Sequence, residues 1–309
     1  MIYGSRCANL CQLNCCTSFL IMGYEPHILC VLPTAWPLQN APAAMNATWM
    51  LECDRVVFAV SHDQLRVAPA SNLANRVSVE PTHARYNKSL GDWKFIRAAI
   101  EVAANHHMGE MDWLLMVEAD VYVRLPIARR YLSRFAPDEP LFMGACACHR
   151  APGMNLFSRG ALSPFLSVSQ ACLPDFGPDW VTLAFGSNTN GGSGDKGIVD
   201  CLLRANLPCH RPLDSHGNVR VAAFGVPITP GSPMLRNISF GEAFCPESKG
   251  CLRSYDAVRT STHQPPDKGK RSPCYSHGTF VFHPVKTAAL MAKIHRIFAP
   301  APAHSPLAV

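Results

Sequence analysis

Apolar runs alternate along the chain with segments whose apolar residues recur at helical spacing. Continuous apolar runs predict buried strands at 27–32, 55–60 and 114–117, because strands of a parallel sheet are covered on both faces. Shorter runs predict strands at 77–79, 140–144 and 279–283. Helical periodicity predicts helices at 43–52, 89–107, 126–135, 161–169, 195–205 and 285–298. Strands alternating with helices predict an α/β domain with a mostly parallel central sheet and helices on both faces.

The apolar run 114–117 ends at two carboxylates. Glu118 and Asp120 are separated by one residue, and residues i and i+2 of an extended chain point the same way. Both carboxylates can therefore face one hard cation. A turn with solvated acids accounts for the same triplet, because so short a motif also arises by chance. Open α/β sheets bind ligands at the carboxyl ends of their strands, which makes this stretch the first candidate site.

Composition narrows the class of protein. The 309 residues are 48% hydrophobic and 16% charged, enough to bury one large core or two modest ones. The formal net charge is +6, but Lys and Arg are scattered, which argues against a dedicated nucleic-acid surface. This mild positive balance fits a phosphate-bearing small ligand, and a solvated surface explains it equally well.

Fourteen cysteines and three glycosylation sequons, which begin at Asn46, Asn87 and Asn237, favour the secretory pathway. Cys146-x-Cys148-His149 is a compact cluster, but it lacks the second Cys/His pair of a structural zinc site. We therefore expect disulfides, with some cysteines simply buried.

Two disulfide pairs are predicted. Cys30 lies on the first expected strand and Cys53 just before the second, so the two are neighbours in a parallel sheet. Cys172 with Cys201 is the second pair.

Residues 27–298 form the expected domain, and a segment lies on each side of it. Within 1–26, the stretch 10–24 leans apolar but contains Gln12 and Asn14 and falls short of the roughly 20 residues of a spanning helix. It fits a weak or truncated signal-anchor. The Pro- and Ala-rich residues 299–309 are expected to be a mobile tail.

A collinear set of short stretches carries a family resemblance. They are Ile28-Leu29-Cys30, Ala47-Thr48-Trp49, Cys53, Val56-Val57-Phe58, Trp93-Lys94, Asp112-Trp113-Leu114-Leu115, Asp120-x-Tyr122-Val123, Asp138-Glu139-Pro140-x-x-x-Gly144, Cys274 and Phe282-His283. In this order the chain resembles the Fringe-like β1,3-glycosyltransferases, most closely the core 1 β1,3-galactosyltransferase branch. The match covers about Ile28 to Ile297, and its strength lies in collinearity.

The resemblance implies a GT-A fold and an inverting, Mn²⁺-dependent enzyme. Its donor would be a UDP-sugar, UDP-galactose in this branch, and its acceptor the 3-hydroxyl of GalNAc on a glycoprotein or glycopeptide. It also implies a Golgi membrane protein of type II topology with a lumenal catalytic domain, anchored through its N-terminus. A homodimer is compatible with it.

Metal ligands are carried over by position. The resemblance assigns Asp120 as the main metal ligand, and Glu118 stands where the family usually has Asp, as a ligand or a donor contact. His283 matches the second ligand near the C-terminus, although a histidine satisfied at a strand end fits the sequence too.

The remaining roles concern the catalytic base and the donor. Asp195 falls where the inverting base is expected, and a helix N-cap explains it as well. Lys94 and Trp93 are assigned to donor binding; a solvated helix face and a core position are the alternatives.

The chain departs from the family pattern mainly on the acceptor side. Ala119 occupies the middle of the acid motif, residues 151–154 replace a glycine-rich segment, and Gly194 replaces an acid. Two alternatives therefore stay open: a non-catalytic, chaperone-like or binding member of the same fold, and a β1,3-glycosyltransferase with another sugar or acceptor.

Overall fold

The computed structural model describes the parts of the chain that build a central sheet and its covering helices. These parts are residues 24–33, 40–61, 77–82, 110–144, 154–172, 201–202, 204–215, 220–222, 235 and 277–298. The predicted helix at 89–107, most of that at 195–205, and the segments 1–23 and 299–309 lie outside them. The domain limits therefore stay predictions.

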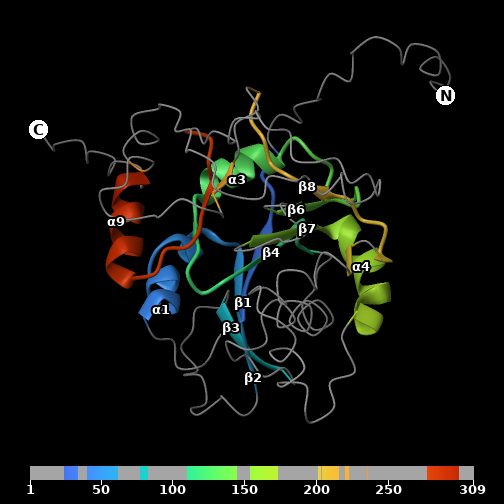
Figure 1. The fold of residues 1–309 in the computed structure, drawn as a ribbon, viewed down its shortest axis with the longest axis horizontal. Helices are drawn as coiled ribbons and strands as arrows, with labels where there is room; N and C mark the ends of the chain where they lie inside the picture. The colour runs from blue at the N-terminus through green and yellow to red at the C-terminus, as the bar shows by residue number, and fades with distance from the viewer. Residues whose placement is uncertain are drawn as a thin grey trace, which may run out of the picture.

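A seven-stranded sheet in the order β3-β2-β1-β4-β7-β6-β8 forms the centre of the described fold (Figure 1). Its strands are β1 (Ile28–Pro33), β2 (Arg55–Ser61), β3 (Val77–Thr82), β4 (Trp113–Val117), β6 (Phe142–Gly144), β7 (Met154–Ser158) and β8 (Cys209–His210). The pairs β1–β2, β2–β3, β1–β4 and β6–β8 are parallel, and β7 is antiparallel to both β4 and β6. The predicted mostly parallel sheet is confirmed.

A second, three-stranded sheet joins the middle of the chain to its C-terminal part. It has the order β5-β10-β9, formed by β5 (Tyr122–Val123), β10 (Val281–Phe282) and β9 (Val221–Ala222). β10 is antiparallel to β5, with Phe282 opposite Tyr122. This pairing brings residues near position 283 beside the acid motif.

Side chains of the main sheet alternate between two apolar clusters, one on each face. Along β1, Ile28, Cys30 and Leu32 belong to one cluster, and Leu29 and Val31 to the other. The first cluster is completed by side chains of α1 (Asn40–Asn46), the 3₁₀ helix η1 (Trp49–Glu52), α3 (Leu125–Leu132) and α9 (Ala288–Phe298). The second is completed by α4 (Arg159–Cys172), which Figure 1 shows on the side away from α1 and α9. Helices cover both faces, as predicted.

The helix predicted at 43–52 is broken into two pieces. α1 ends at Asn46, and η1 begins at Trp49. Between them the hydroxyl of Thr48 donates to the carbonyl of Ala44 at 2.6 Å, occupying an acceptor of the preceding helical turn. Threonine side chains compete with the backbone in this way, so a helix readily ends there.

β7 was not predicted from the sequence, although it lies between β4 and β6 in the middle of the sheet. Its residues, Met-Asn-Leu-Phe-Ser, include no β-branched side chain, and all five are buried. Pairing with two neighbours, not propensity, makes this segment a strand.

The predicted Cys30–Cys53 disulfide is present, with the two Cα atoms 6.1 Å apart. Cys201 and Cys209 each take part in a disulfide bond as well. The Cys172 side chain lies outside the described residues, so its pairing with Cys201 stays a prediction. No helix in the described segments combines the length and apolar character that a bilayer-spanning helix requires.

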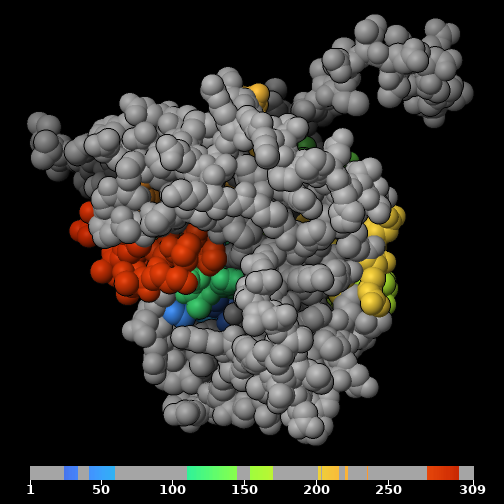
Figure 2. Space-filling model, viewed as in Figure 1, coloured from blue at the N-terminus to red at the C-terminus, as the bar shows by residue number. Residues whose placement is uncertain are grey.

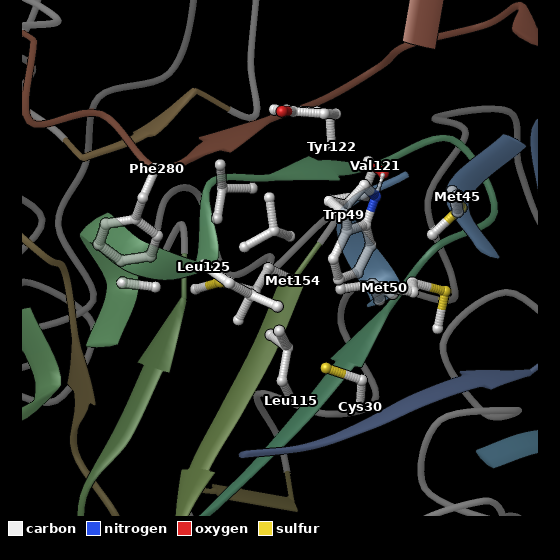
Figure 3. Packing of buried hydrophobic residues seen from close by; sticks show 14 of the residues in the cluster. Cys30, Met45, Trp49, Met50, Leu115, Val121, Tyr122, Leu125, Met154 and Phe280 are labelled. Atoms are coloured by element: carbon white, nitrogen blue, oxygen red, sulfur yellow. Dashed lines mark hydrogen bonds between the residues drawn. The ribbon is translucent and has the colours of Figure 1, made fainter. Parts of the chain in front are cut away.

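Trp49 anchors the core beneath the acid motif. Its fully buried indole packs in the same cluster as Met45 and Met50, and its Nε1–H donates to the Val121 carbonyl at 3.0 Å (Figure 3). Val121 immediately follows Asp120. The tryptophan therefore fixes the backbone just beyond the acidic turn.

Candidate metal-binding site

The turn that carries the two acids is held at both ends. β4 stops at Val117, and its five residues are fully covered, so Glu118 marks the point where the chain leaves the sheet. After the turn, Val121 accepts the Trp49 indole N–H, and Tyr122 enters the second sheet. The acids therefore lie at the carboxyl end of a central parallel strand, as predicted.

His283 reaches this turn from the C-terminal segment. Because Phe282 pairs with Tyr122, the next residue along β10 comes beside the residues that precede β5. The Val285 N–H donates to the Asp120 carbonyl at 2.7 Å, which holds the chain beyond His283 against the turn. The approach is fixed further by Arg124.

Arg124 is buried directly after β5 and ties the entry of β10 in place. Its Nη1 donates to the carbonyls of His277 and Thr279 at 2.7 and 3.1 Å, and its backbone N–H to that of Phe280 at 2.7 Å. Its guanidinium also stacks over the Phe298 ring, 4.2 Å from the centroid. These bonds fix the register of β10 against β5 and thereby position His283 beside the turn.

Glu118, Asp120 and His283 converge on one point. His283 Nε2 lies 2.9 Å from Glu118 Oε2 and 3.2 Å from Asp120 Oδ1. One candidate ligand atom from each residue lies within 4.8 Å of the others. The side chains are 12%, 22% and 17% exposed for His283, Glu118 and Asp120, so the cluster is largely buried but not sealed from solvent.

The two segments that supply the cluster also meet on the molecular surface. In Figure 2, part of the green segment 110–144 is exposed next to the red segment 277–298. This agrees with the pairing of β5 and β10, which joins the two segments.

A fourth charged group, Lys286, contacts the cluster. Its Nζ donates to Asp120 Oδ2, the carboxylate oxygen that does not face His283, and its side chain is 71% exposed. Sequence reasoning missed this residue. The feature of the sequence that could have pointed to Lys286 is its position three residues after His283, between the last strand and α9.

The charges of the cluster reinforce one another. Burial alone would raise the pKa of Asp120, but hydrogen bonds and charges from His283 and Lys286 outweigh it and lower the pKa to about 2. Burial alone would lower the pKa of His283, but Asp120 and Glu118 raise it to about 10. At neutral pH Asp120 therefore stays ionised and His283 stays protonated, and the two groups stabilise each other in the metal-free protein.

The donor set fits a divalent metal ion. Carboxylate oxygens suit hard cations, and imidazole suits borderline ones, a combination that Mn²⁺ and its neighbours accept. Three protein ligands leave further coordination positions for water or substrate, as catalytic metal sites require. An internal salt-bridge cluster is the purely structural reading of the same contacts, and metal titration separates the two.

The structure brings together three of the six residues assigned from the sequence: Glu118, Asp120 and His283. Trp93, Lys94 and Asp195 lie outside the described residues, so their assigned roles stay predictions.

Asn155 is a second polar group that the sequence did not single out. It lies on β7 opposite Met116, close to the end of β4, and it is fully buried. Within the described part of the chain, its amide oxygen and nitrogen make no hydrogen bond.

Comparisons with known proteins leave the family open. No protein-family model matches the chain. Among solved structures, the crystal structure of mannose-1-phosphate geranyltransferase from Thermus thermophilus aligns with a TM-score of 0.31 and 12% sequence identity, covering 57% of this chain and 68% of that one. So low a TM-score assigns neither fold nor activity. The functional argument therefore rests on the site itself.

Proposed function

We propose that the chain is a metal-dependent glycosyltransferase of the GT-A type that uses a UDP-sugar donor. The observation that carries the proposal is the convergence of Glu118, Asp120 and His283 at the carboxyl end of β4. The collinear resemblance of the chain to the core 1 branch supports the finer assignment, which is inverting transfer of galactose to the 3-hydroxyl of GalNAc with Mn²⁺.

Each residue of the cluster has a distinct part in this proposal. Asp120 and Glu118 supply anionic oxygen ligands, and His283 supplies a neutral nitrogen, so it gives up its proton when metal binds. A divalent cation held by these residues would neutralise charge on a departing nucleoside diphosphate. The acceptor hydroxyl needs a carboxylate base, a role that remains assigned to Asp195.

The same proposal places the protein in the lumen of the secretory pathway, at the Golgi membrane. The Cys30–Cys53 disulfide and the bonded Cys201 and Cys209 support an oxidising compartment.

A UDP-sugar panel with and without Mn²⁺ tests the activity. We expect transfer or hydrolysis of UDP-galactose only when Mn²⁺ is present, and loss of at least about a hundredfold in Asp120→Asn, which keeps the shape and removes the charge. Glu139→Gln, which changes an exposed carboxylate before β6, is the matched control and should retain full activity.

Two results would separate the alternatives. Mn²⁺ binding without turnover of any UDP-sugar would favour the non-catalytic member of the fold. Unchanged turnover in Asp120→Asn would show that this cluster is not the catalytic metal site.

A further inference from the structure

We propose that Lys286 is the phosphate-binding residue of this site, and that it serves as the counter-ion of Asp120 only until metal binds. The inference rests on the proposed function, because it names a residue that would hold the diphosphate of the UDP donor. It begins from the contact between Lys286 Nζ and Asp120 Oδ2.

The ammonium and a metal ion compete for Asp120. Lys286 takes one carboxylate oxygen, while the other lies 3.2 Å from His283 Nε2, so both oxygens face cationic or metal-ligating groups. A divalent ion bound by Asp120 would repel a lysine ammonium a few ångströms away. The two cations therefore compete for the charge of Asp120.

Lys286 can move at little cost. Its side chain is 71% exposed, so water can solvate the ammonium when it leaves Asp120. Its backbone, by contrast, is fixed, because the neighbouring Val285 N–H is bonded to the Asp120 carbonyl at 2.7 Å. The displaced ammonium therefore stays at the rim of the metal site.

An anion held by the metal is the natural new partner. Lysine carries a compact charge on a flexible stem and binds phosphate as a point charge. Lys286 also directly precedes the N-terminus of α9, where the Thr287 hydroxyl accepts the Leu290 N–H at 3.1 Å. The first turn of a helix favours anions, so charge and backbone act in the same direction.

Binding measurements on the full chain test the proposal without relying on turnover. Calorimetric titrations with Mn²⁺ alone, and then with UDP at saturating Mn²⁺, are compared for the wild type, Lys286→Met and Lys286→Arg. Lys293→Met, which alters an exposed lysine of α9, is the matched control.

The two ligands should respond in opposite directions. Lys286→Met should bind Mn²⁺ at least as tightly as the wild type, because a competing cation is gone, but bind UDP about tenfold more weakly. Lys286→Arg should restore most of the UDP affinity, and Lys293→Met should match the wild type. Uridine, which has no phosphate, should bind the wild type and Lys286→Met equally.

The two possible negative results lead to different conclusions. Equal UDP affinity in the wild type and Lys286→Met, or an equal loss for uridine, would overturn the role of Lys286 alone. A wild type that binds neither Mn²⁺ nor UDP would overturn the proposed function together with it.

Discussion

Arg129 of α3 ties together the N-terminal ends of β1 and β2. Its guanidinium donates to the Pro26 carbonyl, and its Nη2 donates to the Glu52 carbonyl at 2.9 Å and to Asp54 Oδ2 at 2.7 Å. The same Asp54 oxygen accepts the Ile28 N–H at 2.6 Å. Arg129 and Asp54 are only 13% and 28% exposed, so water replaces either partner incompletely.

Replacing Arg129 with Met keeps an apolar stem and removes the charge and every donated bond. Asp54 is then left half-buried without its cation. Removing one partner of a buried pair costs about 3–5 kcal/mol, whereas an exposed pair is worth about 0–1 kcal/mol. The exposures of this pair place the expected loss of unfolding free energy between these limits, at about 2–3 kcal/mol.

Urea unfolding with the disulfides intact, followed by the fluorescence of buried Trp49 and Trp113, measures this loss. Arg130→Met, at the next and exposed position of α3, is the matched control and should change stability by less than about 0.5 kcal/mol. Equal losses in the two variants, or a loss below about 1 kcal/mol in Arg129→Met, would refute the reasoning. Mn²⁺ affinity should not change, because this ion pair lies at the opposite ends of the parallel strands from the acids.

Two further predictions concern the disulfide and the charged cluster. Cys30 and Cys53 are 23 residues apart, so chain entropy predicts that Cys30→Ala/Cys53→Ala lowers the unfolding free energy by about 3 kcal/mol, measured in urea without reductant; a loss under about 1 kcal/mol would contradict it. In metal-free protein, the stabilisation due to Asp120 is lost as the pH falls from 3.8 through about 2, and that due to His283 as the pH rises from 6.5 through about 10. In EDTA we therefore expect the melting temperature to fall as the pH rises through this upper range. It should fall less in His283→Gln, whose side chain faces Glu118 and Asp120 but does not titrate. The same dependence of melting temperature on pH in both proteins would exclude the assigned pairing.

Parts of the fold with a strong local signal were predicted well. β1, β2 and β4 coincide with continuous apolar runs, because a strand covered on both faces needs apolar residues at every position. α3 and α9 follow their apolar periodicity, and α9 begins three residues later than predicted. β7 was missed because its place depends on β4 and β6, and the break near Thr48 because it depends on one side-chain hydrogen bond.

The sequence by itself determined which residue types lie at the end of β4: two carboxylates whose spacing lets them face one cation. It could not determine what meets them, because spacing along a strand gives direction but no long-range distance. Only the tertiary structure decided that, through the pairing of Tyr122 with Phe282, which brings His283 within 3.2 Å of both acids and Lys286 onto Asp120. The acid motif is therefore a property of the local sequence, and the candidate metal site is a property of the fold.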